Sequence, residues 1–275
     1  MNMYKEINDI ILCTDMVRCG KKLIHFANAA LLEKNRASIV KHFHEQLKSA
    51  FIEYVFDSSD SRFWITRGRN AVSVYLALTI PKSSPVKTLK AIQSLGEYIA
   101  SNFMPPIGNA ISEKRILEIM DYLDNKYDFS KKVFSKNKAV FALLDCSHKK
   151  YDSECLVTTS ENGDVSQHLF LYHLNSDENK NAESVFFHEL AHTLHARYFG
   201  NLEVPENIIL LLKEVCFPTI DSLSKEQQSE VFADVLSMGL MYEGPFYKYD
   251  PFSRIHEDDK KIFKQMADHI LNAIV

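Results

Sequence analysis

The spacing of apolar positions changes near residue 138, and this change separates two groups of predicted elements. Before it, apolar side chains recur at helical spacing through the first 56 residues, which predicts two helices there. Helices are also predicted over 85–103 and 112–127, and a hairpin of strands over 63–66 and 71–78. Beyond it, alternating residues predict strands over 139–144, 155–159 and 168–174. We therefore expect an α+β fold with a mainly helical region over 1–130 and a second region over 131–275 that begins with a small antiparallel sheet.

Helical spacing returns after the predicted sheet. One arc of a helix over 182–199 carries the apolar residues Phe187, Leu190, Ala191, Leu194 and Tyr198. Asn181 is a typical N-cap, and Gly200 stands where a helix often ends in a left-handed residue. Ser224 and Gln227 form a capping-box pattern at the start of another helix, and a last helix is predicted over 257–274. We expect the apolar face of the 182–199 helix to lie opposite its polar face.

The polar face of the 182–199 helix carries the sequence His188-Glu189-Leu190-Ala191-His192. Residues four apart on a helix point in nearly the same direction, so both imidazoles can bind one ion. Glu189 lies about 100° around the helix axis, where its carboxylate can act as a base toward a water molecule that a metal activates. The composition predicts only about 0.03 chance occurrences of this pattern. The motif therefore predicts a catalytic zinc site.

A catalytic zinc ion usually has three protein ligands and one open position. His195 is the nearest further histidine, but it lies about 10 Å along the helix axis from His188, too far to share the ion. Glu230 and Asp234 share one face of the helix that follows Ser224, among many apolar neighbours. The simplest assignment makes Glu230 the third ligand and Asp234 a hydrogen-bond acceptor that orients a ligand histidine.

The pattern His188-Glu189-x-x-His192 followed by Glu230-x-x-Ala233-Asp234 resembles the gluzincin division of the zincin metallopeptidases. The resemblance covers about residues 168–242. It implies a zincin-like core, one Zn²⁺ bound by His188, His192 and Glu230, Glu189 as general base, and Asp234 as an orienting acid. It also implies that the strand over 168–174 is the sheet edge that pairs with an extended substrate.

A peptidase also needs a hydrogen-bond donor for the oxyanion that forms during hydrolysis. Several candidates follow the Glu230 helix, and the sequence does not choose among them: Tyr247 and His256, and also Tyr242, Tyr249 and Arg254.

Composition narrows the possible partners and compartments. The chain has 275 residues, 46% of them hydrophobic and 25% charged, with a net charge of −4. These values are ordinary for a globular protein, and without a basic block they do not indicate nucleic acid or membrane as a partner. The acidic N-terminal residues do not resemble a secretory signal, and the five cysteines form no CxxC pair. We expect a cytoplasmic protein with free thiols, although delivery into a host cell by a non-Sec route stays open.

Three functions fit these observations. The first is an intracellular zinc endopeptidase acting on a specific protein or peptide, such as a regulator or the target of a delivered effector. The second is a binding or regulatory protein that retains a zincin fold with little turnover. The third is another zinc amidohydrolase, although the cysteine ligand typical of deformylases is not found upstream in the expected setting. The sequence does not indicate the oligomeric state.

Overall fold

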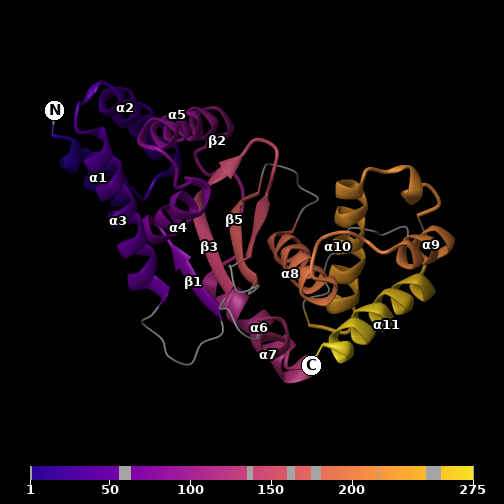
Figure 1. Ribbon diagram of the computed structural model, residues 1–275. Helices are drawn as coiled ribbons and strands as arrows, with labels where there is room; N and C mark the ends of the chain where they lie inside the picture. The colour runs from indigo at the N-terminus through magenta and orange to yellow at the C-terminus, as the bar shows by residue number, and fades with distance from the viewer. Residues whose placement is uncertain are drawn as a thin grey trace. The chain divides into compact units, whose positions relative to one another are not determined.

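The structure is a computed structural model that describes residues 2–55, 63–134, 139–159, 165–174, 181–215, 217–245 and 255–274. These residues form eleven α-helices, one short 3-10 helix and five strands (Figure 1). They confirm the α+β class. The chain divides into two compact units, one comprising residues 1–110, 140–152 and 170–176 and the other comprising 111–139, 153–169 and 177–275. The predicted division near residue 130 stays a prediction.

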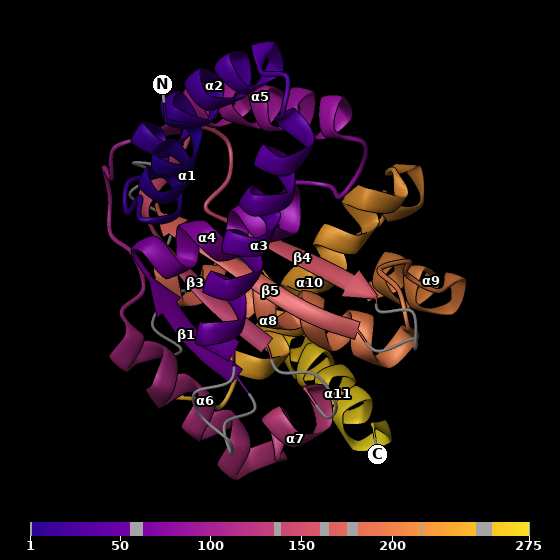
Figure 2. The ribbon, with the colours of Figure 1, turned by 60° about the vertical axis from the view of Figure 1, so that its left-hand side comes forward.

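The first unit begins with three helices, where the sequence predicted two. They are α1 (Met3–Ile11), α2 (Met16–Leu32) and α3 (Arg36–Val55). The helix is interrupted between α1 and α2, and a new helix begins because Asp15 caps α2. The Asp15 side chain accepts a hydrogen bond from the backbone N–H of Arg18 at 3.0 Å. Farther along, α2 packs on α5 (Pro85–Asn102), and the two lie side by side in Figures 1 and 2. A Cβ atom at Gly96 would lie 2.8 Å from the carbonyl oxygen of Gly20, so these glycines permit the close approach.

The predicted hairpin in this unit is wrong in its second half. Strand β1 (Phe63–Arg67) is present, but the residues predicted as a strand over 71–78 form helix α4 (Arg69–Thr79). Every residue from Ala71 to Leu76 is buried. A short run without a polar face shows no hydrophobic periodicity that separates a helix from a strand. The strand was predicted from its β-branched residues, and that preference is weak. Burial on all sides therefore decided the helix here.

The sheet contains five strands, and its order is β1-β3-β5-β4, with the two-residue β2 (Phe103–Met104) paired to β3. The other members are β3 (Ala139–His148), β4 (Ser153–Thr159) and β5 (Val165–His173). The sheet is mixed and open rather than wholly antiparallel. The strand predicted as the edge over 168–174 is inside the sheet, because β5 pairs with both β3 and β4 (Figure 2). Its residues 167–172 are all buried, as an inner strand requires, and β4 is the strand at the end of the order.

The second unit contains the remaining helices. They are α6 (Glu113–Tyr127), α7 (Phe129–Val133), α8 (Ala182–Phe199), α9 (Glu206–Val215), α10 (Lys225–Met241) and α11 (Glu257–Ala273), with a 3-10 helix, η1, at Ile220–Ser222. The predicted helices over 85–103, 112–127, 182–199 and 257–274 are thus confirmed to within a residue at each end. Helix α10 packs against both α8 and α11. A Cβ atom at Gly239 would lie 2.9 Å from the Ala267 methyl group, so α10 and α11 approach closely there.

The caps predicted for two helices of this unit are present. The Asn181 side chain accepts a hydrogen bond from the backbone N–H of Glu183, and Gly200 adopts φ +75° at the end of α8. Ser224 and Gln227 form the reciprocal capping box of α10. Arg115 of α6 binds both carboxylate oxygens of Glu183, at 2.8 and 3.0 Å, which fixes the first turn of α8.

Helix α8 was expected to carry its apolar residues on the face opposite the two histidines, and in the structure both faces are largely buried. All residues from Phe186 to Ala196 are buried except His188, including Glu189, His192 and His195. The reason is that β4 and α10 both pack against α8, so the polar side of the helix is enclosed as well. Its polar residues therefore need partners within the protein.

Two further expectations concern the chain as a whole. Four cysteines, Cys13, Cys19, Cys146 and Cys155, are free thiols, as expected, and Cys216 lies outside the described residues. Among the described helices, none combines the length and the apolar character needed to cross a membrane.

Candidate functional site

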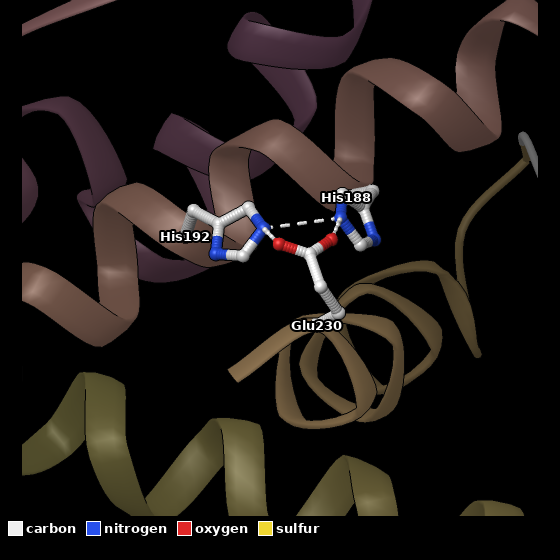
Figure 3. A group of neighbouring side chains, drawn as sticks. All are labelled: His188, His192 and Glu230. Atoms are coloured by element: carbon white, nitrogen blue, oxygen red, sulfur yellow. Dashed lines mark hydrogen bonds and ion pairs between the residues drawn. The ribbon is translucent and has the colours of Figure 1, made fainter. Parts of the chain in front are cut away.

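Three side chains from α8 and α10 converge on one point. One ligand atom from each of His188, His192 and Glu230 lies within 4.8 Å of the other two. Figure 3 shows the Glu230 carboxylate pointing between the two imidazoles. The Nε2 atoms of the histidines are 3.1 Å apart, and the Glu230 oxygens lie 3.1 Å from Nε2 of His188 and 3.4 Å from Nε2 of His192. The structure therefore brings together the three residues that the sequence proposed as ligands.

These separations fit a divalent cation. Zinc lies about 2.0–2.1 Å from a histidine nitrogen, so neighbouring ligand atoms on a tetrahedron are about 3.3 Å apart. The two Nε2 atoms are 3.1 Å apart; Oε2 of Glu230 lies 3.1 Å from Nε2 of His188, and its other oxygen, Oε1, lies 3.4 Å from Nε2 of His192. Two neutral imidazoles and one carboxylate are a donor set that catalytic zinc uses. The cluster thus has the composition and spacing of a cation site without large movement of its side chains.

The cluster is open to solvent on the side of Glu230. The Glu230 side chain is 56% exposed, whereas those of His188 and His192 are 20% and 8% exposed. The sequence indicated apolar neighbours around the two acids of this helix, and the residues from Val235 to Met241 are all buried. An exposed side would let an ion and water reach the cluster.

Asp234 orients His188. Its carboxylate lies 2.7 Å from Nδ1 of His188, on the opposite side of the ring from Glu230. Since both ring nitrogens face carboxylate oxygens, the metal-free ring holds two protons. Burial alone would lower the pKa of His188, but hydrogen bonds to Asp234 and Glu230 outweigh it and raise this pKa to about 10. The Glu230 carboxyl shows the opposite shift, because hydrogen bonds from His188 and His192 lower its pKa.

This charge arrangement predicts how zinc binding depends on protons. A metal must replace the proton on Nε2 of His188, so zinc binding at pH 7.5 should release about one proton. A histidine with an ordinary pKa would release only about 0.1 proton at this pH. Calorimetric titration with zinc in buffers of different ionisation enthalpy measures the number released. Release near the lower value in the wild-type protein would contradict the arrangement.

The matched variants for this titration are both on α10. Asp234→Ala should release fewer protons and bind zinc about 10- to 100-fold more weakly, because Nδ1 of His188 loses its acceptor. Glu226→Ala, which removes an exposed carboxylate from the same helix, should behave as the wild-type protein does.

Glu189 follows His188 on α8 and its charge acts on His188, but it is not one of the three cluster members. Its side chain is buried, and its Oε1 atom accepts a hydrogen bond from the Ser153 hydroxyl of β4 at 2.5 Å. Its other oxygen, Oε2, is buried without a hydrogen-bond partner. A buried carboxylate with one free oxygen can accept a proton, which is what a general base must do.

Sequence reasoning missed the contribution of β4 to this site. The Ser153 side chain of β4 is hydrogen-bonded to Glu189. Cys155, two residues later on the same strand, is affected by the charges of Glu189 and Glu230. Burial away from water, and to a smaller extent the charges of these carboxylates, raise the pKa of the Cys155 thiol well above its usual range. Cys155 therefore stays protonated, and it is not a member of the three-residue cluster. Alternation along β4 places Ser153 and Cys155 on one face, but the sequence contains no signal that this face meets α8.

His195 is outside the cluster, as its distance along the helix predicted. Its Nε2 atom donates a hydrogen bond to the backbone carbonyl of Glu203 at 3.2 Å, and its ring packs against Phe199 and Phe232. Burial lowers the pKa of His195 to about 4, so the ring is neutral. It has the surroundings of a core histidine.

The oxyanion candidates remain predictions. Tyr247, Tyr249 and Arg254 lie outside the described residues. His256 is the N-cap residue of α11, with a side chain that is 80% exposed and 3.8 Å from Asp258. The Tyr242 hydroxyl donates a hydrogen bond to Glu257 at 2.6 Å.

The chain was also compared with known proteins. No protein-family model, no curated protein and no solved structure matches it. The conclusion about function therefore depends on the residues and geometry of the site itself.

Proposed function

We propose that this protein is a zinc-dependent endopeptidase whose centre comprises His188, His192 and Glu230, with Glu189 as general base. One observation carries the proposal. The ligand atoms of the three residues lie within 4.8 Å of one another, and the residue that follows His188 on the same helix is Glu189, whose side chain is buried. The two histidines and Glu189 form the motif that the zincin resemblance requires, and Glu230 comes from a separate helix at the position that it implies.

The proposed chemistry divides between the ion and the chain. When bound, a zinc ion supplies a Lewis acid that polarises a carbonyl group and makes water a stronger nucleophile. The three ligand residues would hold it, and Asp234 would keep Nδ1 of His188 protonated, so that the proton displaced by the ion is the one on Nε2. Glu189 accepts a proton from the attacking water on its unpaired oxygen and later transfers it to the leaving amine.

We further propose that the substrate is an extended peptide that pairs with β4. This strand is at the end of the sheet order and packs against α8, which carries the motif. An edge strand offers backbone donors and acceptors to an incoming peptide, and this recognises a main chain with little regard to its side chains. Such pairing favours a peptide bond over a small amide as the substrate class.

Two measurements on the purified wild-type protein test the proposal. The first is its metal content after dialysis, by mass spectrometry, with one zinc per chain expected. The second is incubation with a library of peptides from a digested proteome, in which new termini are identified. A protein that binds zinc but cleaves none of these peptides would favour the binding or regulatory function, and cleavage of simple amides alone would favour another amidohydrolase. A protein that takes up no zinc would exclude the proposal.

A further inference from the structure

The carboxylate of Glu189 is held asymmetrically. The Ser153 hydroxyl, 36 positions earlier in the chain, donates to Oε1 at 2.5 Å, and Oε2 is buried without a partner. The Glu189 side chain is only 5% exposed, and no described protein group donates to Oε2. Leaving a buried carboxylate oxygen unpaired costs free energy, which selection for stability alone does not favour.

The hydrogen bond also restricts which oxygen can react. A carboxylate that rotates freely about its last bond presents either oxygen in any direction. With Oε1 bound to the hydroxyl of β4, the two oxygens are no longer equivalent, and Oε2 is the one left to accept a proton. Positioning of this kind matters because a general base must be within hydrogen-bond reach of the proton that it removes.

We propose that Ser153 is a positioning residue that orients the Glu189 carboxylate toward the metal centre. This inference deepens the proposed function and rests on it. Ser153 is the first residue of β4, and Cys155 on the same face of the strand is within the influence of both Glu189 and Glu230. The strand proposed to bind substrate thus also sets the orientation of the base, so substrate binding and proton transfer share one element.

Binding of a hydroxamate provides a test that does not need the natural substrate. A hydroxamate chelates a catalytic metal and gives its hydroxyl proton to the neighbouring base, so its affinity reports the position of that base. We would load the whole chain with Co²⁺ and titrate it with acetohydroxamate, following the visible absorption of the cobalt. Ser153→Ala should bind acetohydroxamate about 10-fold more weakly, the loss expected for a hydrogen bond to a charged group. Ser153→Thr retains the hydroxyl and should stay within about twofold of the wild type.

The chain offers a matched control. The Ser130 hydroxyl also donates to a carboxylate, that of Asp124 at 2.8 Å, and Ser130 is buried. Ser130→Ala removes a similar bond elsewhere in the same unit and should leave the affinity for acetohydroxamate unchanged. If Ser153→Ala does not fold, Ser153→Cys replaces the hydroxyl by a weak donor of similar size and should show the same loss.

The outcomes separate the two claims. A wild-type protein that binds no cobalt contradicts the proposed function itself. Equal acetohydroxamate affinity in the wild type, Ser153→Ala and Ser153→Cys, with cobalt bound in all three, overturns only the role of Ser153. An equal loss in Ser153→Thr or in Ser130→Ala also overturns it, since it would indicate general damage instead of orientation of Glu189.

Discussion

Replacing Glu189 with glutamine is expected to slow peptide hydrolysis by about 10²- to 10⁴-fold, the usual contribution of a general base. Zinc content should not change, because Glu189 is not one of the three residues whose ligand atoms converge. The fold should not weaken either. The glutamine oxygen can still accept the bond from Ser153, and the buried charge is removed. Cleavage rate, zinc content and thermal unfolding of the same preparation measure the three effects.

The control for this variant is Glu226→Gln, which makes the same chemical change at an exposed position on α10. It should alter none of the three measurements. Hydrolysis by Glu189→Gln at the wild-type rate would mean that Glu189 is not the base. Loss of zinc together with activity would instead place Glu189 among the ligands and require a different base.

Replacing Glu230 with alanine should remove the metal. The variant leaves two histidines on one helix, whereas a catalytic zinc ion needs three protein ligands. Losing a residue that is hydrogen-bonded to a ligand usually weakens metal binding about 10- to 100-fold. Losing a ligand itself should weaken zinc binding by more than that. The fold should be largely retained, since the Glu230 side chain is 56% exposed and contributes little to the core. Zinc content after dialysis and competition with a chelator measure the effect.

Glu226→Ala, one helical turn earlier on α10, is the matched control and should keep one zinc per chain. Wild-type zinc content in Glu230→Ala would assign the third ligand elsewhere. Asp234 is then the nearest alternative, since it already contacts His188 at 2.7 Å. Glu203 is a weaker one, because its carboxylate is bound to Lys225 at 2.8 Å.

The site helices were predictable because their signals are local. The ends of α8 follow from a side chain that caps its first turn and a glycine that closes its last. The capping box of α10 is equally local. Helical periodicity then places His188 and His192 on one face without knowledge of any other element. These parts of the site depend on residues within a few positions of one another.

The errors lie where local signals were balanced or absent. The run 71–78 contains β-branched residues and no polar face, so propensity favoured a strand, and burial in the first unit made it α4. The order of strands in the sheet has no local signal at all. For this reason the edge was assigned to 168–174, although β4 is the strand at the end of the order.

Residue pattern alone therefore specified the two site helices, their caps and the candidate ligands on each. Tertiary structure alone decided that Glu230 of α10 meets the two histidines of α8 at hydrogen-bond distance, that β4 adjoins them, and that Ser153 binds Glu189. The physical reason is range. Capping and periodicity arise from contacts between near neighbours in the chain, whereas Glu189 and Ser153 are 36 positions apart and His188 and Glu230 are 42 apart. Such pairs meet only because burial of apolar surface packs their strands and helices together.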